Sequence, residues 1–122
     1  MDKIILIDGK EVGFRANALT PRLYRHKIGR DIIRDLNQLK CSYEKSVNSK
    51  HKETEKEEIP IVDLEIFENV AFVMARHYDE NIPNTVEEWL ENFSIFSIYE
   101  VLPEVLELWR LNQQTTSIPK KK

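Results

Sequence analysis

Cysteine, glycine and long apolar runs are scarce in this sequence, and each scarcity excludes a class of protein. One cysteine, Cys41, allows no internal disulfide. Three glycines are too few and too scattered for a phosphate-binding loop. No apolar run approaches the ~20 residues that cross a bilayer. The first apolar stretch, residues 4–7, is shorter than the core of a signal peptide. We therefore expect a small soluble protein of the cytoplasm.

Groups that could carry catalysis or bind a metal are also sparse. The histidines, His26, His51 and His77, have none of the spacings that a zinc site requires. The acidic cluster over residues 87–91 is typical of a solvated helix face, because paired-carboxylate catalysis needs burial. The sequence thus predicts no enzyme, no metal site and no cofactor.

Charge is distributed unevenly along the chain. Residues 20–40 contain six Lys or Arg and two acids, whereas residues 61–112 contain two Arg and eleven acids. Such segments can attract each other within one chain or between neighbouring copies, and the sequence leaves both alternatives open.

The periodicity predicts an α+β fold, mainly helical, with an N-terminal β-hairpin followed by about four helices. Asp8-Gly9 lies between two apolar runs and is a strong signal for a tight turn. A helix over 20–40 is indicated by Thr20 as N-cap and by Pro21 in the first turn. Gly29 within it indicates either a close backbone approach or a tolerated imperfection.

A charged stretch over residues 41–60 contains almost nothing to bury, so we expect a disordered loop there. Asp63 is the expected N-cap of a second helix that runs to about Tyr78 and is apolar on nearly every side, as in a central buried element. Thr85 with Glu88 forms a capping box that starts a short third helix.

The last predicted helix has two possible starts. A capping box at Ser97 and Glu100 favours a start there with a kink at Pro103, whereas a start near Leu102 would place that proline in the first turn. We expect a single domain over residues 1–112, followed by a disordered tail over residues 113–122.

Two groups of side chains are candidates for self-association or partner binding. Basic residues of the first helix could bind an acidic neighbour or, as an alternative function, the phosphates of a nucleic acid in a regulator or adaptor. Aromatic residues are enriched in binding hot spots, although core packing is the competing interpretation for each. The candidates are Arg22, Arg25, Arg30, Arg34, Trp89, Phe93, Phe96, Tyr99 and Trp109.

Four segments of the chain together resemble the tail assembly chaperones of long-tailed bacteriophages and prophages of Gram-positive bacteria. They are residues 7–14 (IDGKEVGF), 20–31 (TPRLYRHKIGRD), 67–75 (FENVAFVMA), and 85–93 (TVEEWLENF) leading into 98–109 (IYEVLPEVLELW). No segment is a chemical signature by itself, and the likeness lies in their order and spacing.

This resemblance implies a protein of the host bacterial cytoplasm that is absent from the mature virion. Such a protein binds the tape-measure protein, keeps it soluble and helps to recruit the major tail-tube protein. The resemblance also implies a homo-oligomer and a longer form of the chain made by ribosomal frameshifting. The terminal lysines, residues 120–122, are compatible with a slippery site or with a simple solubilising tail.

Overall fold

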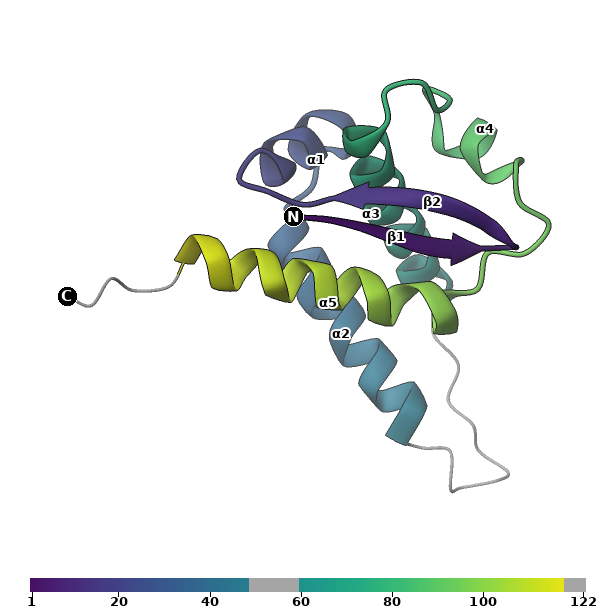
Figure 1. Cartoon of the computed structure of the whole chain (residues 1–122). Coiled ribbons are helices and arrows are strands. Elements are labelled where there is room, and N and C mark those ends of the chain that lie inside the picture. The colour runs from purple at the N-terminus through teal and green to yellow at the C-terminus, as the bar shows by residue number, and fades with distance from the viewer. Residues whose placement is uncertain (49–59, 118–122) are drawn as a thin grey trace.

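A computed structural model describes the backbone of residues 1–48 and 60–117 and the side chains of residues 1–46 and 60–112. It confirms a mostly helical α+β fold in which an N-terminal hairpin precedes the helices (Figure 1). The elements in this part of the chain are β1 (Asp2–Ile7), β2 (Lys10–Arg15), α1 (Thr20–Ile28), α2 (Ile32–Asn48), α3 (Ile61–Tyr78), α4 (Val86–Leu90) and α5 (Ile98–Ser117).

The hairpin forms as the sequence predicts. Strands β1 and β2 pair antiparallel, with Ile5 opposite Val12. Asp8 and Gly9 have φ angles of 56° and 77°, and two positive φ values are what a two-residue type I′ turn requires. Ile5 and Ile7 are buried, so alternate residues of β1 face the helices.

Helix α3 is the central element, as its apolar character predicts. It contacts β2 and each of the helices α1, α2, α4 and α5, and it passes behind the two strands in Figure 1. Its buried apolar side chains are Ile66, Phe67, Val70, Ala71, Phe72, Val73, Met74 and Ala75. Burial on several sides explains why this helix has no polar residue between Asn69 and Arg76.

The prediction of one continuous helix over 20–40 is wrong, because α1 ends at Ile28 and α2 begins at Ile32. Gly29 has φ 83° and ψ 19°, and its N–H donates to the carbonyl of Arg25 at 2.9 Å. A left-handed glycine with this bond is a common helix C-cap, because glycine adopts positive φ without a Cβ clash. Gly29 therefore ends a helix instead of lying inside one.

Helix α2 is longer than predicted. It continues to Asn48, so the expected loop over 41–60 is wrong for its first eight residues, and residues 49–59 lie outside the described part of the chain. Tyr43 packs against the core, and Ser46 is buried at 9% exposure. These contacts extend α2 through a segment whose composition alone indicated little to bury.

Asp63 is not the N-cap of α3, which begins at Ile61 after Pro60. The carboxylate of Asp63 is buried and accepts hydrogen bonds from the amide of Gln38 and the hydroxyl of Ser42, both on α2. The acid therefore joins the first turn of α3 to α2.

The predicted starts of α4 and α5 and the predicted end of α5 can each be compared with the structure. The Oγ1 of Thr85 accepts the N–H of Glu88 at 3.2 Å, so the predicted cap of α4 is confirmed. Helix α5 begins at Ile98 and contains Pro103, which rules out the predicted alternative of a start near Leu102. The predicted disordered tail is wrong for residues 113–117, because the backbone is helical to Ser117, and 118–122 are outside the described residues.

Gly13 allows a close approach between β2 and the end of α3. A Cβ at this position would lie 2.2 Å from Cε1 of Tyr78. The Tyr78 ring is also held by Arg15, whose guanidinium carbon lies 5.6 Å from the ring centroid. Only glycine leaves room for this ring above the strand.

We expect Gly13→Ala to lower the free energy of unfolding by about 1–2 kcal/mol, because the new methyl group must displace the Tyr78 ring. Urea unfolding would measure the change. In a Tyr78→Ala background the same substitution should cost less than about 0.5 kcal/mol, since nothing then occupies the space. An equal cost in both backgrounds would contradict this explanation.

Candidate partner-binding groove

An open groove of about 500 Å³ lies between α1 and the C-terminal half of α3. Four apolar side chains form much of its lining, and one of them, Leu19, is 46% exposed. Polar and charged groups provide the rest. The lining residues are Leu19, Leu23, Phe72, Val73, His26, Lys27, Arg76, His77, Glu80 and Asn84. The groove therefore combines apolar contact area with the charged side chains of Lys27, Arg76 and Glu80, which makes it a candidate binding site.

The wall made by α1 is held in place by a buried carboxylate at the corner between α1 and α2. Asp35, 2% exposed, accepts Nε and Nη2 of Arg30 at 2.8 Å each and the hydroxyl of Tyr24 at 2.7 Å. Burial opposes the charged form of Asp35, but the bonds from Arg30 and Tyr24 outweigh it and hold its pKa below the ordinary value. Burial, together with the hydrogen bond to Asp35, raises the pKa of Tyr24. The corner is thus a charged cluster in which the carboxylate of Asp35 is hydrogen-bonded to both Arg30 and Tyr24.

The far end of the groove is closed by the loop over residues 79–84. Arg76 donates to the carbonyls of Glu80 and Ile82 at 2.9 and 3.0 Å. From the opposite wall, Lys27 donates to the carbonyl of Asn84 at 2.9 Å. These two cations fix the loop while leaving their charge at the rim.

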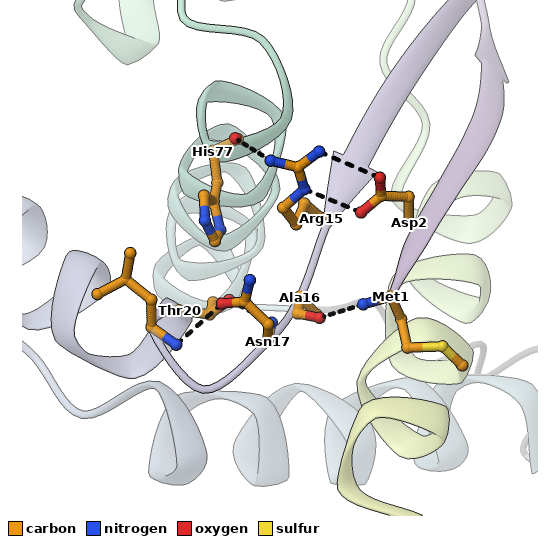
Figure 2. A network of polar contacts seen from close by, with 8 residues as sticks. Met1, Asp2, Arg15, Ala16, Asn17, Thr20 and His77 are labelled. Atoms are coloured by element: carbon orange, nitrogen blue, oxygen red, sulfur yellow. Dashed lines mark hydrogen bonds and ion pairs between the residues drawn. The ribbon is translucent and has the colours of Figure 1, made fainter. Parts of the chain in front are cut away.

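The start of α1 and the end of α3 meet in a small polar network (Figure 2). Arg15 pairs with Asp2 at 2.9 Å, and its Nη1 lies 3.5 Å from the carbonyl of His77. Thr20 does not cap α1, whose N-cap is Leu19; instead its Oγ1 accepts the N–H of Asn17 at 2.9 Å. The network ties the hairpin to both helices that form the groove.

His77 lies at the junction of this network and the groove. Its Nδ1 is buried and has no hydrogen-bond partner among the described residues. Burial first, and then the positive charge of Arg15, lower the pKa of His77 below its ordinary value. The imidazole is therefore neutral at pH 7, and the cationic character of the rim comes from its lysine and arginine.

The basic residues predicted as partner-binding do not form one surface. Arg22 and Arg25 are exposed on α1, and their side chains bond to no other described residue. Arg34 is exposed on α2. Arg30 instead donates to Asp35, so its first role in this fold is internal.

Most of the predicted aromatic candidates pack in the core. The Trp89 ring lies 5.4 Å from each of the rings of Phe93 and Phe96 and 5.8 Å from that of Phe72. Trp89 is 2% exposed, whereas Tyr99 is 48% exposed. The structure therefore brings Trp89, Phe93 and Phe96 together as a packing cluster and leaves Tyr99 at the surface.

Trp109 lies apart from that cluster. It is 8% exposed and lines a second, smaller cavity of about 290 Å³ between α2 and α5, together with Tyr43 and Leu106. The predicted aromatic residues thus divide between the core, the surface and this cavity.

Sequence reasoning missed the apolar lining of the groove, although part of the signal was present. Leu19, Leu23 and Lys27 follow one another at four-residue intervals, which places them on one flank of a helix. The contribution of α3 could not be separated from its core-facing residues, because that helix is apolar on nearly every side.

Comparison of the chain with models of known protein families, with curated proteins and with solved structures found no match. Within the described residues, no helix is long and apolar enough to cross a membrane. The same part of the chain contains no group of three or more His, Cys, Asp or Glu that could hold a metal ion.

Proposed function

We propose that this chain is a non-catalytic tail assembly chaperone that binds a phage tape-measure protein and keeps it soluble. The observation that carries the proposal is the open apolar groove between α1 and α3, with Leu19 exposed in its lining. The resemblance of four sequence segments to this chaperone family points to the same function.

The groove suits one face of an amphipathic helix. Recognition of this kind places apolar anchors at helical spacing into a groove formed by neighbouring helices. Lys27 and Arg76 at the rim favour a partner helix with carboxylates beside its apolar stripe. A tape-measure protein is a long helical chain, and covering its apolar stripe would prevent aggregation.

The remaining parts of the proposal come from the family resemblance. They are recruitment of the major tail-tube protein, a longer frameshifted form of this chain, residence in the bacterial cytoplasm and absence from the mature virion. An open reading frame that overlaps the codons of residues 120–122 in the source genome would support the frameshift.

The nucleic-acid alternative has less to support it. Its basic segment consists of two helices separated at Gly29, so it cannot lie in a groove as one continuous rod. Arg30 is paired with Asp35, and Lys27 is bonded to Asn84. DNA binding that weakens steeply with added salt would support this alternative function.

We expect Leu19→Glu to reduce the soluble yield of the partner at least about fivefold when the two proteins are expressed together, because it places a carboxylate in the apolar groove. The partner is the product of the next large open reading frame in the source genome. Soluble and insoluble fractions would be compared by gel densitometry.

Ile33→Glu is the matched control. Ile33 is 47% exposed, nearly equal to Leu19, and it lies in the first turn of α2 outside the groove. It should leave the soluble yield unchanged. If the wild-type chain neither binds nor solubilises the partner, the proposed function is wrong; if both variants behave alike, the groove is not the binding site.

A further inference from the structure

One side of α3 continues past the groove toward the start of the helix. Five of its residues recur at alternating three- and four-residue intervals, which places them on one face. They are Val62, Glu65, Asn69, Phe72 and Arg76. The last two line the groove. Val62 and Glu65 are exposed and Asn69 is half-buried, so the other described elements leave this face open along the first half of α3.

Apolar side chains lie at the start of this face. Ile61 and Val62 are 77% and 57% exposed, and Ile61 is the most exposed large hydrophobic residue in the described part of the chain. The core-facing residues of α3 begin further along the helix, at Ile66. Two adjacent apolar side chains that add nothing to the core, in line with an apolar groove, are typical of a contact surface.

Two carboxylates lie between these apolar side chains and the groove. Glu65 and Glu68 are one turn apart, and neither makes an ion pair with another described residue. Glu68 is half-buried; burial first, and then the charge of Glu65, raise its pKa above the ordinary value. A cation beside the two carboxylates would therefore reduce both their repulsion and the cost of burying Glu68.

Positive charges lie further along the same face. Lys27 reaches from α1 across the ring of Phe72, with its Nζ 5.9 Å from the ring centroid, to the carbonyl of Asn84. Because Lys27 is exposed, a helix lying along α3 would pass over its ammonium group. Arg76 lies one turn beyond Phe72. The order along α3 is therefore apolar, acidic and then basic.

We propose that the helix bound in the groove extends along α3 as far as Val62 and carries both signs of charge. Its carboxylates lie against Lys27 and Arg76. Its Lys or Arg side chains lie against Glu65 and Glu68. This inference rests on the proposed function, because it assigns the charge pattern and the length of the same partner helix.

The geometry of α3 sets the size of the partner segment. From Val62 to Arg76 the face is about 21 Å long, at ~1.5 Å per residue. The partner helix therefore needs about 15 residues, with its carboxylates and its cations about one to three turns apart. Charges arranged in this way fix the register of the bound helix and disfavour helices that carry one sign only.

Three synthetic helical peptides of about 18 residues with the same apolar stripe test the proposal. One carries Glu in one half and Lys in the other, one carries only Glu, and one carries only Lys. Fluorescence anisotropy with the full-length chain would give the three dissociation constants. We expect the mixed peptide to bind at least about tenfold more tightly than either of the others, because a peptide of one sign meets like charges at one end of the face.

Glu65→Lys with Glu68→Lys should change this preference, so that the all-Glu peptide binds most tightly. Glu65→Lys alone, at an exposed position, should shift the affinities in the same direction by a smaller factor. The matched control is Glu87→Lys with Glu91→Lys, which makes the same change in net charge on two exposed residues in and beside α4. It should leave the order of the three peptides unchanged.

Failure of this inference differs from failure of the proposed function. If the wild type solubilises its partner but does not prefer the mixed peptide, or if the preference survives the α3 double variant, the inference is wrong and the chaperone function stands. An equal change of preference in the α4 double variant also overturns it, because net charge would then be responsible. If the peptides bind as expected but the partner stays insoluble, the open face takes such a helix from another protein, and the chaperone function is wrong.

Discussion

Trp89→Ala is expected to lower the free energy of unfolding by about 3–5 kcal/mol, which is the usual cost of removing a fully buried large aromatic side chain. The Trp89 ring is 2% exposed and contacts the rings of Phe72, Phe93 and Phe96. Its removal leaves a cavity where α4 rests on α3, and a five-residue helix cannot close it without losing its own anchor.

Tyr99→Ala is the control, because Tyr99 is a predicted aromatic candidate of the same kind but is 48% exposed. Its cost should stay below about 0.5 kcal/mol. Guanidinium unfolding followed by circular dichroism would measure both variants. If Trp89→Ala left stability unchanged while abolishing partner binding, the aromatic cluster would be a binding site after all.

Arg30→Gln should produce the second large effect, a loss of about 2–3 kcal/mol at pH 7. Fully buried pairs lose ~3–5 kcal/mol when one partner is removed, and water offsets part of this cost because the Arg30 side chain is 50% exposed. The carboxylate of Asp35 is 3% exposed and would remain charged with Tyr24 as a donor. Arg34→Gln, on the exposed surface of α2, should cost less than about 0.5 kcal/mol.

The same pair predicts a pH dependence. The pKa of folded Asp35 lies below its ordinary value of 3.8, so the pair stabilises the fold above that pH and its contribution is lost as the pH falls through the folded value. The difference in stability between the wild type and Arg30→Gln should therefore be largest near pH 7 and shrink below about pH 4. Urea unfolding at several pH values would show it, and a constant difference down to pH 2.5 would contradict the assignment.

The parts of the fold that the sequence predicts well depend on local signals. Asp8-Gly9 specifies its turn through the φ preferences of two adjacent residues. Thr85 caps α4 through a backbone N–H only three residues away. The apolar run of α3 is long enough that its burial follows from composition alone.

The parts that were mispredicted depend on residues that meet only in the folded chain. The break between α1 and α2 is stabilised by Tyr24 and Arg30 converging on Asp35, and no sequence spacing announces this cluster. Asp31 did hold a local signal, since its Oδ1 accepts the N–H of Ile33 at 3.0 Å at the start of α2. With Gly29 this marks a helix end followed by a helix start.

The predicted site shows the same limit. A count of basic residues cannot tell the guanidinium of Arg25, which bonds to no other described side chain, from that of Arg30, which pairs with Asp35. The groove needs Leu19 at the N-cap of α1 and Phe72 from α3, which are brought together by the packing of two helices. The side chains that are available to a partner can therefore be identified only once it is known which side chains are bonded inside the fold.

The long reach of the hairpin's contacts has a consequence for synthesis on the ribosome. Lys3 pairs with Glu104 of α5 at 2.9 Å, and Asp8 accepts the N–H of Ser94, 86 residues further along the chain. These two contacts of the first-translated strands can form only after residues near the end of the chain have been translated. Contacts between residues far apart in the sequence slow folding. The hairpin can pack on α3 once residue 78 has been made, but its contacts with residues 94 and 104 form only when translation is nearly complete.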